Sequence, residues 1–197
     1  MRQPQGARGR VVLQVTAFVM LVLTAGCVPG RMVYTSGPYR GTVVDTETKK
    51  PLAGAVVLAI WFRETIVLVA AHGPAVDYHD SLEVLADSSG KFVVPEKTHL
   101  TPFGKIREAD FVVYYPGYAP YPSLKAQPQG EEVDAAYEQK VFRVELTKLK
   151  TQEERRVGVR DLPVSIAGVP DAEMPNLVRL VNKERQGLGL QAVRLGR

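Results

Sequence analysis

Residues 55–63 form a long, β-prone run that is apolar almost throughout. In a strand, successive side chains point to opposite faces, so both faces of this run would be apolar. One face would carry Val56, Leu58, Ile60 and Phe62, and the other Val57, Ala59 and Trp61. Each face gains stability only when it is removed from water. The run therefore predicts a central strand that is covered on each side.

Shorter β-prone runs, with turn residues between them, accompany this strand. They cover residues 41–45, 82–86, 92–94, 111–115 and 141–146. In the last run apolar and polar side chains alternate, which predicts a strand with one wet face. Asp87 to Gly90 predicts a hairpin turn, and residues 123–138 are expected to form a long loop. Six to seven short strands without long helices between them favour an all-β, antiparallel sandwich over βαβ units.

The C-terminal segment has a helical pattern instead. Thr151 and Glu154 form the Thr-x-x-Glu pattern of a capping box, which predicts a short helix to about residue 157. Asp171 is the predicted cap of a second helix, with Pro175 in its first turn and Gly187 as its stop. One face of that helix would carry Met174, Leu177, Val178 and Val181. We expect this face to lie on the sandwich; the alternative is a tail that becomes helical only when a partner binds.

The N-terminal segment has the pattern of an export signal. Residues 1–10 hold three arginines and no acidic residue, and residues 11–25 are almost wholly apolar. As a helix, that apolar stretch would span roughly 22 Å, which is short of the ~30 Å hydrocarbon core of a membrane. Leu23-Thr24-Ala25-Gly26-Cys27 then resembles the lipobox of bacterial lipoproteins. The segment is therefore predicted to be a secretory signal and not a membrane span.

The lipobox resemblance implies an address in the bacterial cell envelope. In that family a signal peptidase cuts before the cysteine, whose thiol is then lipidated, so residues 1–26 would be a signal peptide and residues 27–38 a lipidated tether. Acylated Cys27 would hold the protein in membrane lipid. Val28, which follows it, resembles the choice that directs such proteins to the outer membrane, facing the periplasm. Cys27 is the chain's only cysteine, so no disulfide can form within the chain.

The charge of the chain does not indicate a nucleic-acid partner. The formal net charge of the whole chain is +4. Removal of the signal segment takes away three arginines and no acidic residue, which leaves a net charge of about +1. The sequence pI of 9.2 is therefore not evidence for nucleic-acid binding.

The turn and strand residues resemble a known domain family. Its marks are Gly41-Thr-Val-Val-Asp45, Pro51-Leu-Ala-Gly-Ala55, Val57 and Trp61, Asp87-x-x-Gly90-x-Phe92 and Pro116-Gly117-Tyr118. Together they resemble the carboxypeptidase regulatory-like domain, and the similarity covers residues 39–148. It implies a seven-stranded antiparallel β-sandwich of the transthyretin-like (prealbumin) type, with residues 149–197 as a short helical appendage. It also implies a binding or structural module that is not an enzyme and needs no cofactor.

A cluster of tyrosines offers a first candidate binding surface. Tyr114, Tyr115, Tyr118 and Tyr121 lie within eight residues, and alternation puts the first two on opposite faces of a strand. One hypothesis is a rigid aromatic surface that stacks on a glycan or docks a partner protein of the envelope. The alternative is that the rings pack across the open end of the sandwich and leave their hydroxyl groups exposed to water.

A second hypothesis is a metal-dependent enzyme that uses residues 72–80. His72, Asp77, His79 and Asp80 supply imidazole and carboxylate ligands of the kind that divalent ions take. The histidine spacing matches neither one helix face nor one strand face, and Gly73-Pro74 indicates a loop, so a solvated loop is the favoured interpretation. His99 has no visible partner. Neither a Gly-x-Ser-x-Gly nucleophile motif nor a glycine-rich nucleotide loop occurs in the sequence.

The lipobox gives a direct prediction. Replacement of Cys27 by serine removes the thiol that would accept the lipid, so the Cys27→Ser chain should stay uncleaved and incorporate no labelled palmitate in cells. Gel mobility and palmitate labelling of the wild-type and Cys27→Ser chains measure this. A Cys27→Ser chain that still fractionates as a processed lipoprotein would show the address to be wrong.

Overall fold

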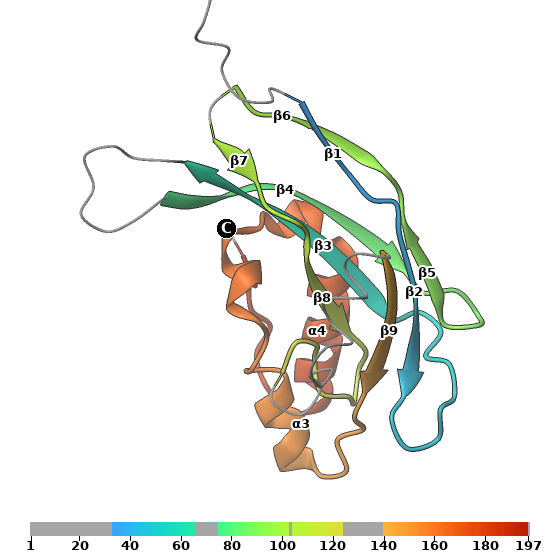
Figure 1. The fold of residues 1–197 in the computed structure, drawn as a ribbon. Helices are drawn as coiled ribbons and strands as arrows, with labels where there is room; N and C mark the ends of the chain where they lie inside the picture. Colours follow the sequence, from blue (N-terminus) through green and yellow to red (C-terminus); the bar gives the residue numbers. More distant parts are fainter. Residues whose placement is uncertain (1–32, 66–74, 103, 124–139, 197) are drawn as a thin grey trace, which may run out of the picture.

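The structure is a computed structural model that describes residues 33–65, 75–102, 104–123 and 140–196 (Figure 1). Strands hold more of these residues than helices do, and the helices lie in the C-terminal part. The strands are β1 (Val33–Ser36), β2 (Tyr39–Asp45), β3 (Val56–Thr65), β4 (Ala75–Leu85), β5 (Lys91–Val94), β6 (Lys97–Leu100), β7 (Lys105–Ile106), β8 (Asp110–Tyr114) and β9 (Val141–Leu146). The helices are α3 (Gln152–Gly158), α4 (Pro175–Gly187) and the short 3-10 turns η1 (Val164–Gly168) and η2 (Asp171–Glu173).

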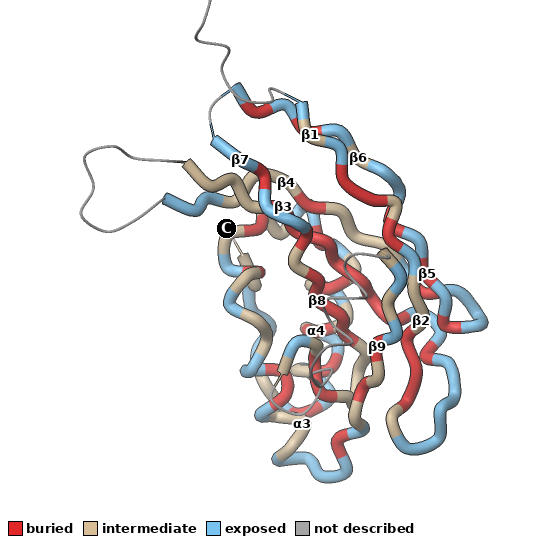
Figure 2. Tube along the Cα trace, in the orientation of Figure 1, coloured by how far each residue is buried: buried red, intermediate tan, exposed pale blue. Residues whose placement is uncertain are grey.

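Strand β3 is central, as its two apolar faces predict. It pairs along one edge with β4 and along the other with β7 and β8, all antiparallel. Its first six residues, from Val56 to Trp61, are completely buried. In Figure 2, the part of β3 that runs through the middle of the molecule has the red colour of buried residues. One side of this sheet faces a second sheet, and the other side faces the C-terminal helices (Figure 1).

The second sheet has the order β5-β2-β9. Strand β5 pairs with β2 antiparallel, whereas β9 pairs with β2 in parallel. The expectation of a purely antiparallel sandwich is therefore wrong at this one ladder. Strands β2 and β9 are far apart in sequence, so no short hairpin loop forces them to run in opposite directions.

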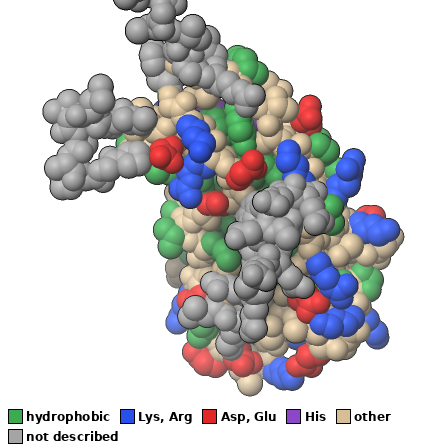
Figure 3. Space-filling view, in the orientation of Figure 1, with side chains coloured by type: hydrophobic (Ala, Val, Ile, Leu, Met, Phe, Trp, Pro, Cys, Tyr) green, Lys and Arg blue, Asp and Glu red, His purple; other side chains and the backbone are tan. Residues whose placement is uncertain are grey.

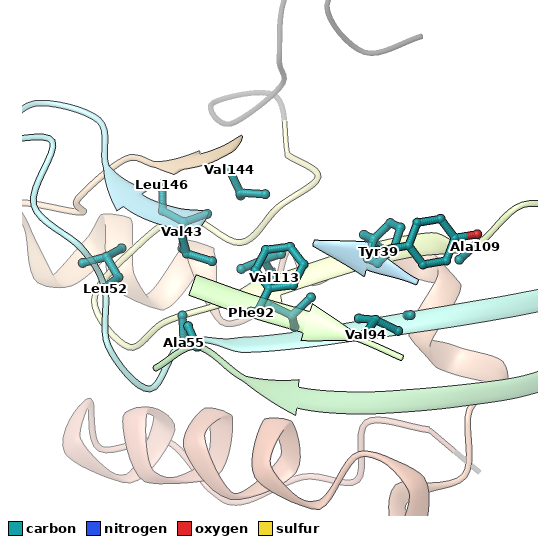
Figure 4. Close-up of a cluster of buried hydrophobic side chains, with 14 of the residues drawn as sticks. Tyr39, Val43, Leu52, Ala55, Phe92, Val94, Ala109, Val113, Val144 and Leu146 are labelled. Atoms are coloured by element: carbon teal, nitrogen blue, oxygen red, sulfur yellow. The ribbon is translucent and has the colours of Figure 1, made fainter. Parts of the chain in front are cut away.

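The two sheets enclose the first core. Figure 4 shows side chains from both sheets pointing toward one another. From β3 this core takes Val57, Ala59 and Trp61, and from β9 it takes Val144 and Leu146. Gly41 of β2 leaves room for it, since a Cβ there would lie 2.6 Å from the ring of Phe92. The alternating pattern of β9, with apolar residues inward, is confirmed by this packing.

Helix α4 and the turns before it cover the other face of β3. They form a second core with Val56, Leu58 and Ile60, to which the C-terminal segment contributes Ile166, Val169, Met174, Leu177 and Val181. The predicted apolar face of α4 is therefore correct, and so is its position on the sheet. The alternative of a tail that folds only on a partner does not describe this chain. The capping box of α3 is also confirmed, because Thr151 and Glu154 make both of its hydrogen bonds.

The start of α4 is capped from a distant strand. Glu83 of β4 accepts hydrogen bonds from the backbone N–H groups of Asn176 (2.9 Å) and Leu177 (2.7 Å). A carboxylate there satisfies free N–H groups and complements the helix dipole. Asp171, the predicted cap, lies in η2 and accepts from Gly196 N–H instead. That prediction was wrong because the cap comes from tertiary structure.

The folded body begins earlier than the predicted tether allows. Val33–Ser36 forms β1, which pairs with β6, whereas the sequence predicts a tether over residues 27–38. The β1–β6 and β2–β5 ladders follow one register along a single long ribbon. Gly37-Pro38 and Pro95 interrupt it, because proline has no N–H to donate to a ladder. The sequence pattern missed β1 because most of its side chains are exposed or half-buried.

The turn at Asp87 to Gly90 forms as predicted, but it does not make a hairpin. The Asp87 carboxylate accepts from the N–H groups of Ser89 and Lys91, and Gly90 has a φ of 73°. Strand β4 pairs with β3 and β5 pairs with β2, so the turn carries the chain from one sheet to the other. Local turn chemistry specifies the bend and not the partners of the strands that flank it.

The packing of α4 on β3 gives a stability prediction. Leu177 is 1% exposed, and truncation to alanine would leave a cavity against β3. Leu177→Ala should lower the free energy of unfolding by about 2–5 kcal/mol in urea denaturation.

Val164→Ala is the matched control, since Val164 is 89% exposed, and it should change stability by less than about 0.5 kcal/mol. Equal effects of the two substitutions would contradict the role of α4 as the second cover of the sheet.

Candidate functional site

The four tyrosines do not share one surface. Tyr114 is 1% exposed and packs in the core beneath α4, whereas Tyr115 packs on the side of the first core. The prediction that these two point to opposite faces is confirmed. The ring of Tyr118 lies 5.5 Å from that of Tyr115, edge to face. Tyr121 is half-buried against the first core.

Tyr118 links its segment to the start of the sandwich. Its hydroxyl donates to the carboxylate of Asp45 at 2.9 Å. Burial, together with this carboxylate, raises the pKa of Tyr118 to about 12. Of the four rings, those of Tyr115, Tyr118 and Tyr121 are half-buried and reach the surface in part.

The predicted loop at residues 72–80 is largely a strand. Residues 75–80 belong to β4, and His72 lies outside the described residues. The pattern failed here because β4 follows β3 over its whole length and pairs with it from Thr65 to Val56. A bulge opposite Trp61 and Phe62 leaves His79 without a paired residue, and bulges of this kind re-aim side chains. Asp77 is exposed at the far end of the strand.

His99 forms the centre of a buried polar cluster that the sequence did not reveal. Its ring lies 4.9 Å from that of Trp61 and 5.3 Å from that of His79. Its Nε2 is 3.2 Å from Oγ of Ser36, and its Nδ1 is 3.6 Å from Oδ2 of Asp80. These residues come from β1, β3, β4 and β6, so no local signal could have joined them.

The cluster has the residue types of a catalytic triad but not its geometry. Ser36 is completely buried, so no substrate could reach its hydroxyl. The 3.6 Å between Nδ1 of His99 and Asp80 is too long for a hydrogen bond. Lys97 pairs with Asp80 at 2.7 Å. Within the described ranges, no three metal-ligating side chains come together to hold an ion.

A cavity of about 660 Å³ lies between the end of the tyrosine segment and α3. Its described lining is Ala119, Pro120, Ser123, Leu149, Thr151, Glu153, Glu154, Val157, Gly158 and Asp161. The tyrosine-segment wall is held by backbone hydrogen bonds: Tyr121 exchanges two with Val113, and Ala119 N–H donates to Thr147. On the other side, the capping box fixes the first turn of α3. Both walls are therefore set by the fold.

The cavity combines apolar walls with a few polar groups. Oγ of Ser123 is buried and has no hydrogen-bond partner in the described part of the chain. The side chain of Glu153 is 72% exposed, and Asp161 is also exposed, whereas the carboxylate of Glu154 is used by the cap of α3. A ligand with an apolar body and a hydrogen-bonding group fits such a lining. The sequence did not predict this cavity, because its walls meet only in the folded chain.

No family model matches the chain, and no curated protein does either.

None of the described helices is both long and apolar enough to cross a membrane. Residues 1–32, with the predicted signal peptide and Cys27, lie outside the described residues. The address of the protein therefore remains a prediction from the sequence.

The buried His99 predicts a pH dependence of stability. Burial lowers the pKa of His99 below its ordinary value of 6.5, although Asp80 opposes this shift. The unfolded chain then binds this proton at a higher pH than the folded chain does, so the free energy of unfolding should fall as the pH falls below about 6.5. Denaturation above and below this pH measures the effect.

His99→Gln should weaken that dependence, because glutamine does not titrate. His79→Gln is the control and should retain most of it, since burial of His99 is the larger cause. An unchanged pH dependence in His99→Gln would assign the effect to another group.

Proposed function

We propose that the protein is a lipid-anchored, non-catalytic binding module of the bacterial cell envelope, on the outer membrane and facing the periplasm. The N-terminal pattern that ends at Cys27 supports the anchor. The complete burial of Ser36, which lies beside His99, supports a role without catalysis.

We further infer that the sheets belong to the transthyretin-like sandwich of the carboxypeptidase regulatory-like domain. The described residues hold nine strand segments. Strands β1 and β2 continue one another in a single register with β6 and β5. If β1 with β2 and β5 with β6 are each counted as one strand, seven strands remain, and this number supports the proposal. The positions that carry the resemblance take scaffold roles: Trp61 and Phe92 are buried between the sheets. This supports a scaffold whose function lies in surface sites.

The cavity beside α3 is the observation that supports binding. Its walls are held by hydrogen bonds, its lining is largely apolar, and the hydroxyl of Ser123 has no partner among the described residues. A buried hydroxyl group without a hydrogen-bond partner lowers the stability of the folded chain, and a ligand that bonds to it would restore that stability. We therefore propose that an envelope protein or a glycan inserts an apolar group with a hydrogen-bonding atom here. The site includes the end of the tyrosine segment, through Ala119 and Pro120, and not the exposed parts of the rings.

Photocrosslinking in intact cells tests this proposal. A photoreactive amino acid at position 161 would face the cavity mouth and should give a discrete adduct by gel shift and mass spectrometry. Val157→Trp should abolish that adduct, because the indole fills space that the ligand needs.

Val164→Trp provides the control, since it adds the same ring at an exposed site outside the cavity. It should leave the adduct unchanged. An adduct that survives Val157→Trp would show that the ligand does not enter the cavity.

A further inference from the structure

The outer face of the β5-β2-β9 sheet is basic and partly apolar. Alternation in the strands turns Tyr39, Val43, Phe92 and Val144 inward to the core. The residues between them point outward in two cross-strand rows: Val93, Arg40 and Val141, then Lys91, Thr42 and Arg143. Val93 is 51% exposed and Val141 is 57% exposed. Several Lys and Arg side chains lie on this side of the molecule in Figure 3.

The two rows border a shallow groove of about 400 Å³. Its described lining includes Arg40, Lys91 and Arg143 but no acidic residue. Glu145, which lies on the same face of β9, is neutralised by Lys49 at 2.6 Å and by Arg143 at 3.0 Å. The face therefore carries an excess of positive charge, although the mature chain is close to neutral as a whole.

The position of the face in the chain supports a membrane partner. Cys27 precedes Val33 by six residues, which can span at most about 20 Å. Strand β1 then continues into β2, the middle strand of this sheet. Arg40, the first basic residue of this face, is thirteen residues from Cys27, so a lipid on Cys27 would keep the basic sheet within about 45 Å of the bilayer surface. Cations beside exposed valines complement anionic headgroups, with the charges at the phosphates and the apolar groups at the acyl boundary.

We propose that the outer face of the β5-β2-β9 sheet lies against the anionic phosphate headgroups of the membrane that anchors the protein. This inference rests on the proposed lipid anchor, which supplies the proximity, while Arg40, Lys91 and Arg143 supply the orientation. The opposite side of the molecule, where α3 and α4 lie (Figure 1), would then face away from the membrane. The cavity beside α3 would be left open to a partner.

The test uses the full-length protein, purified with its lipid and reconstituted into vesicles. Thr42→Cys places a single reactive thiol between Lys91 and Arg143, since an acylated Cys27 does not react. A fluorophore on that thiol should be quenched several-fold more by headgroup-labelled nitroxide lipids than the same fluorophore at Gln186→Cys on α4. The difference should appear with phosphatidylglycerol in the vesicles, shrink in pure phosphatidylcholine, and weaken as salt is raised.

Charge reversal separates docking from mere tethering. Arg40→Glu with Lys91→Glu should abolish the preference, because both side chains are exposed on the face. Arg160→Glu with Lys183→Glu reverses two exposed charges of the helical side and should retain it. Equal quenching at positions 42 and 186, or quenching that ignores the Arg40 and Lys91 reversals, would overturn the docking face.

The intact mass of the same samples reports acylation of Cys27 separately. An unmodified Cys27 would overturn the anchor; because its free thiol would then take the fluorophore as well, the labels are placed in a Cys27→Ser background, where charge-dependent quenching at position 42 would keep the docking face. An acylated Cys27 with equal quenching at positions 42 and 186 would keep the anchor and overturn the docking face.

Discussion

The two apolar faces of β3 are the constraint on which the rest of the structure depends. A strand that is polar on one side needs a single partner layer, but this one loses stability if either face is exposed. The β5-β2-β9 sheet covers the face that carries Trp61, and α4 with its preceding turns covers the face that carries Leu58. The C-terminal segment is therefore part of the folded body and not an optional appendage.

Polar contacts then fix how the helical layer lies on the sheet. Glu83 of β4 caps α4, and Glu173 accepts from the hydroxyl groups of Tyr78 and Ser81. These contacts occupy the carboxylates of Glu83 and Glu173, and the features that we propose for binding lie at the periphery. One is the cavity beside α3, and the other is the basic face of the outer sheet. The two lie on different layers, which would let one meet the membrane while the other meets a partner.

Local patterns predicted the elements whose reasons are local. The alternation of β9, the capping box at Thr151 and the apolar face of α4 each follow from neighbouring residues. The candidate sites were predicted less well. Of the tyrosines, Tyr114 belongs to the core, and His99 has partners although its own segment shows none. Both outcomes depend on residues from strands that are distant in sequence.

The amino-acid sequence by itself determined a mostly β protein with a central strand buried on both faces, a C-terminal amphipathic helix and an N-terminal pattern typical of export. These properties follow from side-chain periodicity and composition, which act within one segment. Only the tertiary structure decided that β9 runs parallel to β2, that Glu83 caps α4, and that Ser36, Asp80 and His99 meet. Such pairings depend on which surfaces come together when the layers pack, and no pattern within a single segment specifies that choice.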